Sequence, residues 1–195
     1  QTLKNIEIIC INDGSNDKTF DIINKFALED KRIKVFNQEN QGQGVARNNG
    51  IAYATAPYIA FMDPDDWVAI DMYENLYNLI VLNDADFVEC DLNKYYETSG
   101  ELKKVKFDYP AMENKIFNYK SDKNYVFKGT SLSPCNKLFK KSFIISNNIY
   151  FSSRKLSEDQ IFILKAKIFA KKIIYTPIAY YTYNIHPKSS LTTQK

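Results

Sequence analysis

The amino-acid sequence predicts an α/β fold, in which a twisted, mostly parallel sheet is flanked by helices. Short β-branched runs alternate with segments whose apolar residues recur at helical spacing along residues 6–90. Turn clusters rich in Asn, Asp and Gly separate the two kinds of segment. Alternation of this kind implies parallel strands joined by right-handed crossovers.

The first half of the chain contains predicted strands and helices in regular order. The run Ile6–Ile11 (IEIICI) predicts a buried strand because it is rich in β-branched residues. Phe20, Ile23 and Phe26 fall at helical spacing and predict the helix that follows. By the same criteria, further strands are expected at 33–36, 58–62 and 87–90, and helices at 18–29, 45–54 and 72–82.

After Asp91 the alternation ends and an α+β pattern replaces it. Tyr95–Tyr96 and residues 105–107 flank a turn sequence and predict a hairpin. No repeat or Pro/Gly-rich linker interrupts the chain, so we expect a single domain over residues 1–195, with 1–91 and 92–195 as its two parts. Further helices are expected at 137–145 and 159–170, and further strands at 173–175 and 180–183.

The composition is ordinary for a globular protein, with 45% hydrophobic and 25% charged residues among 195. A net charge of +3 is too small to predict nucleic-acid binding. Lysine clusters leave peripheral contact with an acidic membrane open, although a solvated face is the simpler interpretation. Cys10, Cys90 and Cys135 lack metal-site spacing, and their odd number argues against a disulfide framework. We therefore expect a reducing, cytoplasmic location.

The segment Tyr58–Trp67 (YIAFMDPDDW) carries the strongest indication of function. Its apolar run predicts a buried strand, and three carboxylates follow within four positions, at Asp63, Asp65 and Asp66. Burying these charges is costly unless a cation offsets them. Ligands of α/β sheets bind at the carboxyl ends of strands. An Asp-x-Asp pair there predicts a divalent cation completed by phosphates, and the alternative is a solvated turn that caps a helix.

Three other segments place polar residues where ligands could bind. The turn Asn12–Ser15 follows a predicted strand, where it could meet a nucleotide or cap a helix. The loop Gly42–Gly44 precedes a helix whose N–H groups can face an anion, and Arg47 follows in the first turn, with a surface salt bridge as the alternative. The acids of Ser157–Asp159 open a further helix, where its dipole favours them.

The order and spacing of these segments, together with the closing sequence Tyr181–Ser190 (YTYNIHPKSS), resemble those of the family 2 glycosyltransferases. These are inverting enzymes with the GT-A nucleotide-sugar fold, and the resemblance is to bacterial enzymes of surface-polysaccharide assembly. It implies transfer of a sugar from a nucleotide-diphosphate donor, expected to be UDP-linked, to a hydroxyl of a growing surface glycan, free or lipid-linked. Residues 1–91 would then bind the donor, and 92–195 would form the acceptor side.

The resemblance also assigns roles to individual residues. Asp159 is expected to be the general base, and Glu158 to brace the site. Asp13 is expected to contact the base or ribose, and Arg47 the diphosphate. Asp63 is expected to contact the ribose or the metal.

Asp65 and His186 are the metal ligands that the resemblance implies, although His186 could instead complete the diphosphate shell or be an ordinary surface or core residue. Mn²⁺ or Mg²⁺ is the expected ion, and an imidazole ligand suits Mn²⁺ better. Asp66 is expected to support the loop. Trp67 is expected to pack in the core.

The resemblance exposes a difference at the start of the chain. Family members usually begin with an Ile-Pro-x-Tyr/Phe-Asn strand and a helix ahead of the point where this chain opens, so we expect a fragment that lacks them. Two other classes stay open. A sugar nucleotidyltransferase would release pyrophosphate, and a non-catalytic glycan-binding fragment would show no metal-dependent nucleotide binding. Homo-oligomer formation is also left open.

Overall fold

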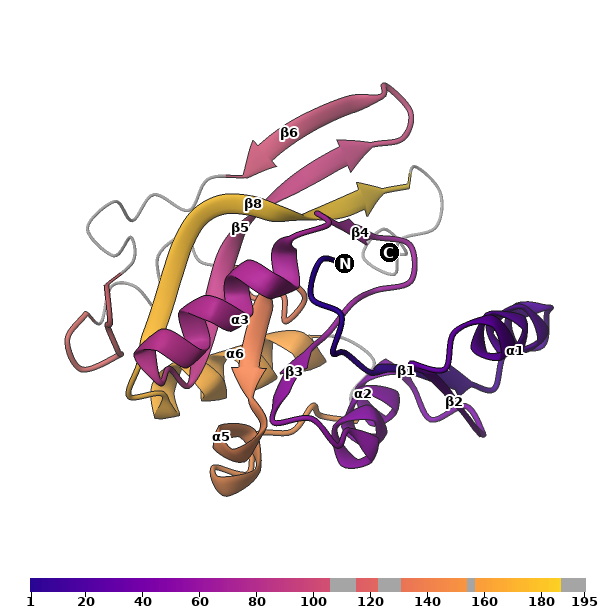
Figure 1. Ribbon diagram of the computed structural model, residues 1–195, viewed down its shortest axis with the longest axis horizontal. Helices are drawn as coiled ribbons and strands as arrows, with labels where there is room; N and C mark the ends of the chain where they lie inside the picture. The colour runs from indigo at the N-terminus through magenta and orange to yellow at the C-terminus, as the bar shows by residue number, and fades with distance from the viewer. Residues whose placement is uncertain (106–114, 123–130, 154–156, 187–195) are drawn as a thin grey trace.

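The computed structural model describes residues 1–105, 115–122, 131–153 and 157–186, which form two sheets. Strands β1 (Ile8–Asp13) and β2 (Ile33–Gln38) pair in parallel. The larger sheet has the order β3-β7-β5-β8-β4, with β6 paired to β5 (Figure 1). Its strands are β3 (Tyr58–Ala60), β4 (Trp67–Val68), β5 (Phe87–Tyr96), β6 (Glu101–Val105), β7 (Lys137–Lys140) and β8 (Ile173–Ile185).

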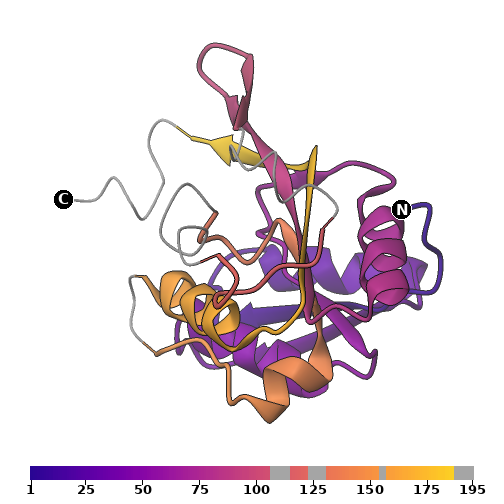
Figure 2. The same cartoon turned by 90° about the vertical axis from the view of Figure 1, so that its left-hand side faces the viewer.

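Helices cover both faces of the larger sheet. Figure 2 shows its strands between α3 (Met72–Asn83) and α6 (Glu158–Phe169). Helix α5 (Lys141–Ser146) directly follows β7. Helices α1 (Thr19–Glu29) and α2 (Gln43–Tyr53) lie beside the small sheet, and α1 buries none of its side chains. Among the described residues, no helix has the length and apolar character needed to span a membrane.

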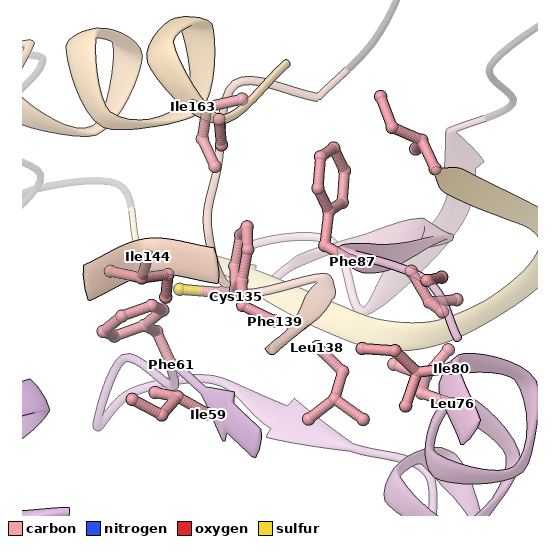
Figure 3. Close-up of a cluster of buried hydrophobic side chains, with 14 of the residues drawn as sticks. Ile59, Phe61, Leu76, Ile80, Phe87, Cys135, Leu138, Phe139, Ile144 and Ile163 are labelled. Carbon is pink, nitrogen blue, oxygen red and sulfur yellow. The ribbon is translucent and has the colours of Figure 1, made fainter. Parts of the chain in front are cut away.

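The hydrophobic core lies on both sides of the larger sheet. Met72, Leu76 and Ile80 of α3 are fully buried because their spacing of four places them on one helix face. Figure 3 shows Leu76 and Ile80 near the strands, with Ile163 of α6 across the sheet. Phe162 of α6 is also fully buried, so α3 and α6 hold the sheet between two apolar layers.

A buried ion cluster joins the sheet to α6. Glu89 of β5 lies 3.3 Å from the Nζ atoms of both Lys137 of β7 and Lys167 of α6. Lys137 also donates hydrogen bonds to the main-chain oxygens of Ser131 at 3.0 Å and Ser133 at 2.8 Å. Burial lowers the pKa of both lysines, that of Lys167 to about 8. The cluster therefore ties β5, β7, α6 and the loop before β7 together.

The α/β class is confirmed, but the strand pairing is mixed rather than mostly parallel. Among the described strands, β1–β2 and β5–β8 are parallel, and the other four pairs are antiparallel. The alternation that predicts parallel pairing ends near residue 90. Strands β6 and β7 come after it, and β6 follows β5 through a tight turn, which requires antiparallel pairing.

One predicted helix is partly wrong. Residues 137–145 were expected to be helical, but Lys137–Lys140 forms strand β7 and the helix begins at Lys141. The reason is tertiary: β7 lies between β3 and β5, where Phe139 pairs with Ile59 on one side and Phe87 on the other.

The other elements of the second half lie close to their predicted positions. The strands expected at 173–175 and 180–183 are one strand, β8, whose pairing with β5 shifts register between Cys90 and Leu92. The expected hairpin is formed by β5 and β6, and residues 106 and 107 of its second strand lie outside the described residues.

Candidate active site

Arg47 of α2 joins acidic side chains from distant parts of the chain. Its guanidinium donates hydrogen bonds to Asp63 at 2.7 Å and to Asp159. It also lies 3.5 Å from Glu158 and over the ring of Phe151, 5.3 Å from the ring centroid. A planar guanidinium can hold two carboxylates in a fixed geometry. Three of the segments singled out in the sequence therefore meet at one site.

The amino end of α2 packs closely against the chain that precedes α6. A Cβ atom at Gly44 would lie 2.3 Å from the main-chain oxygen of Ser152, so a larger residue does not fit. Asn48 donates to the main-chain oxygen of Phe151 and accepts from its N–H, both at 2.9 Å. The helix begins two residues earlier than predicted, so Arg47 lies in its second turn rather than its first.

Asp13 organises the loop that leads into α2. Its carboxylate accepts hydrogen bonds from the N–H groups of Gln41 at 2.9 Å and Gly42 at 2.8 Å. The side-chain amide of Gln38 donates a third, at 2.8 Å. Asp13 thus links the end of β1 to the loop around Gly42, and its contact with a nucleotide stays a prediction.

The three carboxylates after β3 have different surroundings. Asp63 faces Arg47, whereas Asp66 is buried, which raises its pKa. Asp66 accepts hydrogen bonds from the hydroxyl of Tyr181 and from the N–H of Asn184 at 2.8 Å, so it ties the loop to β8 as expected. The side chain of Asp65 is 50% exposed and is therefore open to a ligand.

Asp65 lies beside His186, the only His of the chain. The Nε2 atom of His186 is 3.5 Å from Asp65 Oδ2, and its Nδ1 atom is 2.8 Å from Glu97 Oε2. The hydrogen bond to Glu97 raises the pKa of His186 above its ordinary value. Residues 187–190 of the closing sequence lie outside the described residues.

An oxygen and an imidazole nitrogen that face each other fit two positions of a Mn²⁺ shell. No group of three or more His, Cys, Asp or Glu side chains suited to a metal is assembled within the described ranges. A cation held by Asp65 and His186 would therefore need further ligands, such as phosphate oxygens and water.

Asp159 has the electrostatic properties of a base that works near neutral pH. It occupies the first turn of α6, and its side chain is 31% exposed. Burial raises the pKa of Asp159 to about 6, although the charge of Arg47 acts in the opposite direction. Such a carboxylate is ionised at pH 7 and is a stronger base than an ordinary Asp. Glu158, which is buried beside it, raises the pKa of Asp159 further.

Several residues of this region escaped the sequence analysis. Glu97 and Phe151 contact site residues, although neither stood out in the sequence, and Tyr181, which opens the closing sequence, contacts Asp66. Trp67 was expected in the core, but it is 43% exposed and packs edge-on against Tyr95, with ring centroids 5.3 Å apart. One signal was available in the sequence. Tyr95 and Glu97 lie two positions apart along β5 and the residue that follows it, so their side chains are expected on the same face of the sheet.

The fold and the site define an α/β protein in which a guanidinium from α2 joins acidic side chains from the loop after β3 and from the first turn of α6. Residues 1–146 match the family model described as "Glycosyl transferase family 2". The chain belongs to this family, as the resemblance implied.

Comparison with individual proteins agrees with this family. The chain is 35% identical to EpsH of Bacillus subtilis (strain 168), over 97% of this chain and 55% of EpsH. It is 32% identical to the poly(ribitol-phosphate) beta-glucosyltransferase of Bacillus spizizenii, over 86% of this chain and 25% of that protein. The chain thus spans only part of the length of these relatives.

Solved structures confirm the GT-A fold. TarS 1-349 from S. aureus, in complex with UDP-GlcNAc, superposes with a TM-score of 0.78 over 97% of this chain and 52% of that chain, at 22% identity. The mannosyltransferase PcManGT from Pyrobaculum calidifontis, in complex with GDP-Man and Mn²⁺, gives 0.65 over 94% of this chain and 49% of that chain, at 15% identity. At these identities the likeness shows the fold alone.

Proposed function

We propose that this protein transfers a sugar from a UDP-linked donor to a hydroxyl group of a bacterial surface glycan, with inversion at the anomeric carbon. One observation carries the proposal: Arg47 bridges Asp63 and Asp159, so the donor-side carboxylate and the candidate base are neighbours. Related proteins support the substrate class, because one is named a poly(ribitol-phosphate) beta-glucosyltransferase and one GT-A neighbour is in complex with UDP-GlcNAc.

The donor would lie along the strand ends and the amino end of α2. Asp63 would accept hydrogen bonds from the ribose or contact the cation, and Arg47 would stabilise the diphosphate through charge-assisted hydrogen bonds. Asp13 would contact the nucleoside from the loop at the end of β1. The diphosphate would compete with Asp63 and Asp159 for the guanidinium of Arg47, which is held by both in the structure.

Asp159 would act as the general base. The acceptor oxygen attacks the anomeric carbon as the bond to the diphosphate oxygen breaks, and the hydroxyl proton passes to the Asp159 carboxylate. This proton transfer is worth about 10²- to 10⁴-fold in rate. Glu158 would hold Arg47 in place from its buried position, 3.5 Å from the guanidinium.

Asp65 and His186 would hold Mn²⁺ or Mg²⁺. When bound, the cation would stabilise the negative charge that develops on the leaving nucleoside diphosphate. Because Asp65 is half exposed, this position is reachable by a nucleotide without rearrangement of the core.

The test combines binding and product analysis. Thermal-shift measurements with nucleotide sugars, with and without Mn²⁺, should show cation-dependent stabilisation by UDP compounds, and turnover should release UDP. Asp159→Asn should lower turnover by about a hundredfold or more with donor affinity little changed. Asp21→Asn, which alters an acid in the first turn of α1, is the matched control and should leave turnover unchanged.

Each other outcome points to a different conclusion. Release of pyrophosphate would identify a nucleotidyltransferase, and absence of metal-dependent nucleotide binding would indicate a non-catalytic glycan-binding fragment. If Glu158→Gln abolishes turnover while Asp159→Asn stays active, the two acids have exchanged roles.

A further inference from the structure

We propose that Glu97 is a positioning residue for the cation site. Glu97 fixes the tautomer and the orientation of His186, so that the Nε2 lone pair of the imidazole faces Asp65. The inference rests on the proposed function, because it concerns a cation that binds together with the nucleotide.

The contacts of the imidazole ring agree on one tautomer. Glu97 Oε2 lies 2.8 Å from His186 Nδ1. An ionised carboxylate can only accept a hydrogen bond, so Nδ1 carries the proton. In the neutral ring Nε2 then bears the lone pair, and the side-chain amide nitrogen of Asn184 lies 3.1 Å from it. Neutral imidazole is the form that binds metal ions, and a cation at Nε2 would take the place of this amide contact.

The sheet topology places the three residues together. β8 pairs with β5 in parallel as far as Tyr96 and Ile185, and the N–H of Glu97 donates to the oxygen of Ile185 at 3.3 Å. Glu97 directly follows Tyr96 of β5, and His186 directly follows Ile185 of β8. Both residues therefore leave the same end of the sheet. On its other side β8 pairs with β4, which begins two residues after Asp65. His186 therefore emerges between Glu97 and Asp65.

The same arrangement is common where His binds a metal ion. A carboxylate that accepts the hydrogen bond of the second ring nitrogen orients the ligand and raises its basicity, and its loss weakens metal binding about 10- to 100-fold. The side chains of Glu97 and Asp65 are each about half exposed. Removing Glu97 should therefore leave the fold intact, because exposed ion pairs contribute little to stability.

The experiment measures Mn²⁺ affinity directly, by electron paramagnetic resonance of free Mn²⁺ at saturating UDP. Glu97→Ala should weaken Mn²⁺ binding about 10- to 100-fold. Glu101→Ala is the matched control: it removes an exposed acid of the same hairpin, paired with Lys103 at 3.1 Å, and should leave the affinity unchanged. Glu97→Gln keeps an acceptor oxygen and should retain most of the affinity.

A double-mutant cycle separates positioning from a general electrostatic effect. In a His186→Ala background, Glu97→Ala should have no further effect, because the residue through which it acts is gone. An equal loss in that background, or unchanged affinity in Glu97→Ala alone, would overturn the inference. Failure of the wild-type protein to bind Mn²⁺ in the presence of UDP would instead overturn the cation site of the proposed function.

Discussion

Replacing Asp159 by Asn should stabilise the folded protein at pH 8 while it removes the candidate base. Asn has the shape of the protonated acid and no charge. Arg47 would keep two acidic neighbours, Asp63 at 2.7 Å and Glu158 at 3.5 Å, so the guanidinium would stay paired. The ionised carboxylate that burial disfavours would be gone.

The magnitude follows from the pKa of Asp159, which burial raises from 3.8 to about 6. Between these values the folded protein binds more protons than the unfolded chain, so stability falls as pH rises from about 4 to about 6 and stays reduced above that. The pKa difference corresponds to about 3 kcal/mol. For a domain of this size that is roughly 6–12 °C in melting temperature.

Thermal unfolding of both proteins between pH 4.5 and pH 8 is the assay. Asp159→Asn should melt higher than the wild type at pH 8, and the difference should shrink toward pH 4.5. A variant that melts lower than the wild type at pH 8 would refute the reasoning, because it would mean that the ion pair with Arg47 outweighs the burial of the charge.

Three further outcomes follow from the contacts. Gly44→Ala should destabilise the protein because the added Cβ meets a main-chain oxygen at 2.3 Å. Gly50→Ala in the same helix places its Cβ 3.9 Å from the nearest atom, so it should stabilise the protein by about 0.5–1 kcal/mol. Equal urea midpoints for the two variants would contradict this. Asp65→Ala should abolish Mn²⁺-dependent stabilisation by UDP without lowering the melting temperature of the free protein, and unchanged UDP binding with Mn²⁺ would exclude Asp65 as a ligand. Lys137→Met should lower the free energy of unfolding in urea by about 3–5 kcal/mol, because it leaves Glu89 buried with one lysine fewer. A decrease below about 1 kcal/mol, the scale of an exposed ion pair, would show that the cluster tolerates the change.

Local patterns predicted the elements that are long and packed on one face. Helix α3 was predictable because Leu76 and Ile80 repeat at helical spacing and are buried. Strand β7 was not, because Lys137, Leu138 and Phe139 are buried by neighbours on both sides, and a charged residue at a buried strand position has no periodic signature. β4 is two residues long, too short for any pattern.

The candidate site divides in the same way. Motifs placed Asp63, Arg47 and Asp159 in three separate segments, and the structure brings all three together. Residues that orient the site side chains, such as Glu97, could not be predicted from the sequence, because their roles depend on pairing between distant strands. Glu97 meets His186 only through the register of β5 and β8, which is a property of the folded sheet.

Helix α1 buries no side chain, and Leu28 is 88% exposed. Within the described chain, β1 and β2 pair only with each other. A unit held by so few buried contacts opens at a lower free energy than the rest of the molecule, so its amides should exchange with solvent deuterium first. Asp13 connects this unit to the loop before α2. A nucleotide that contacts both this unit and the loop before α2 would stabilise the unit against opening. Slower deuterium uptake in α1 and β2 would then report donor binding at a distance from the reacting sugar.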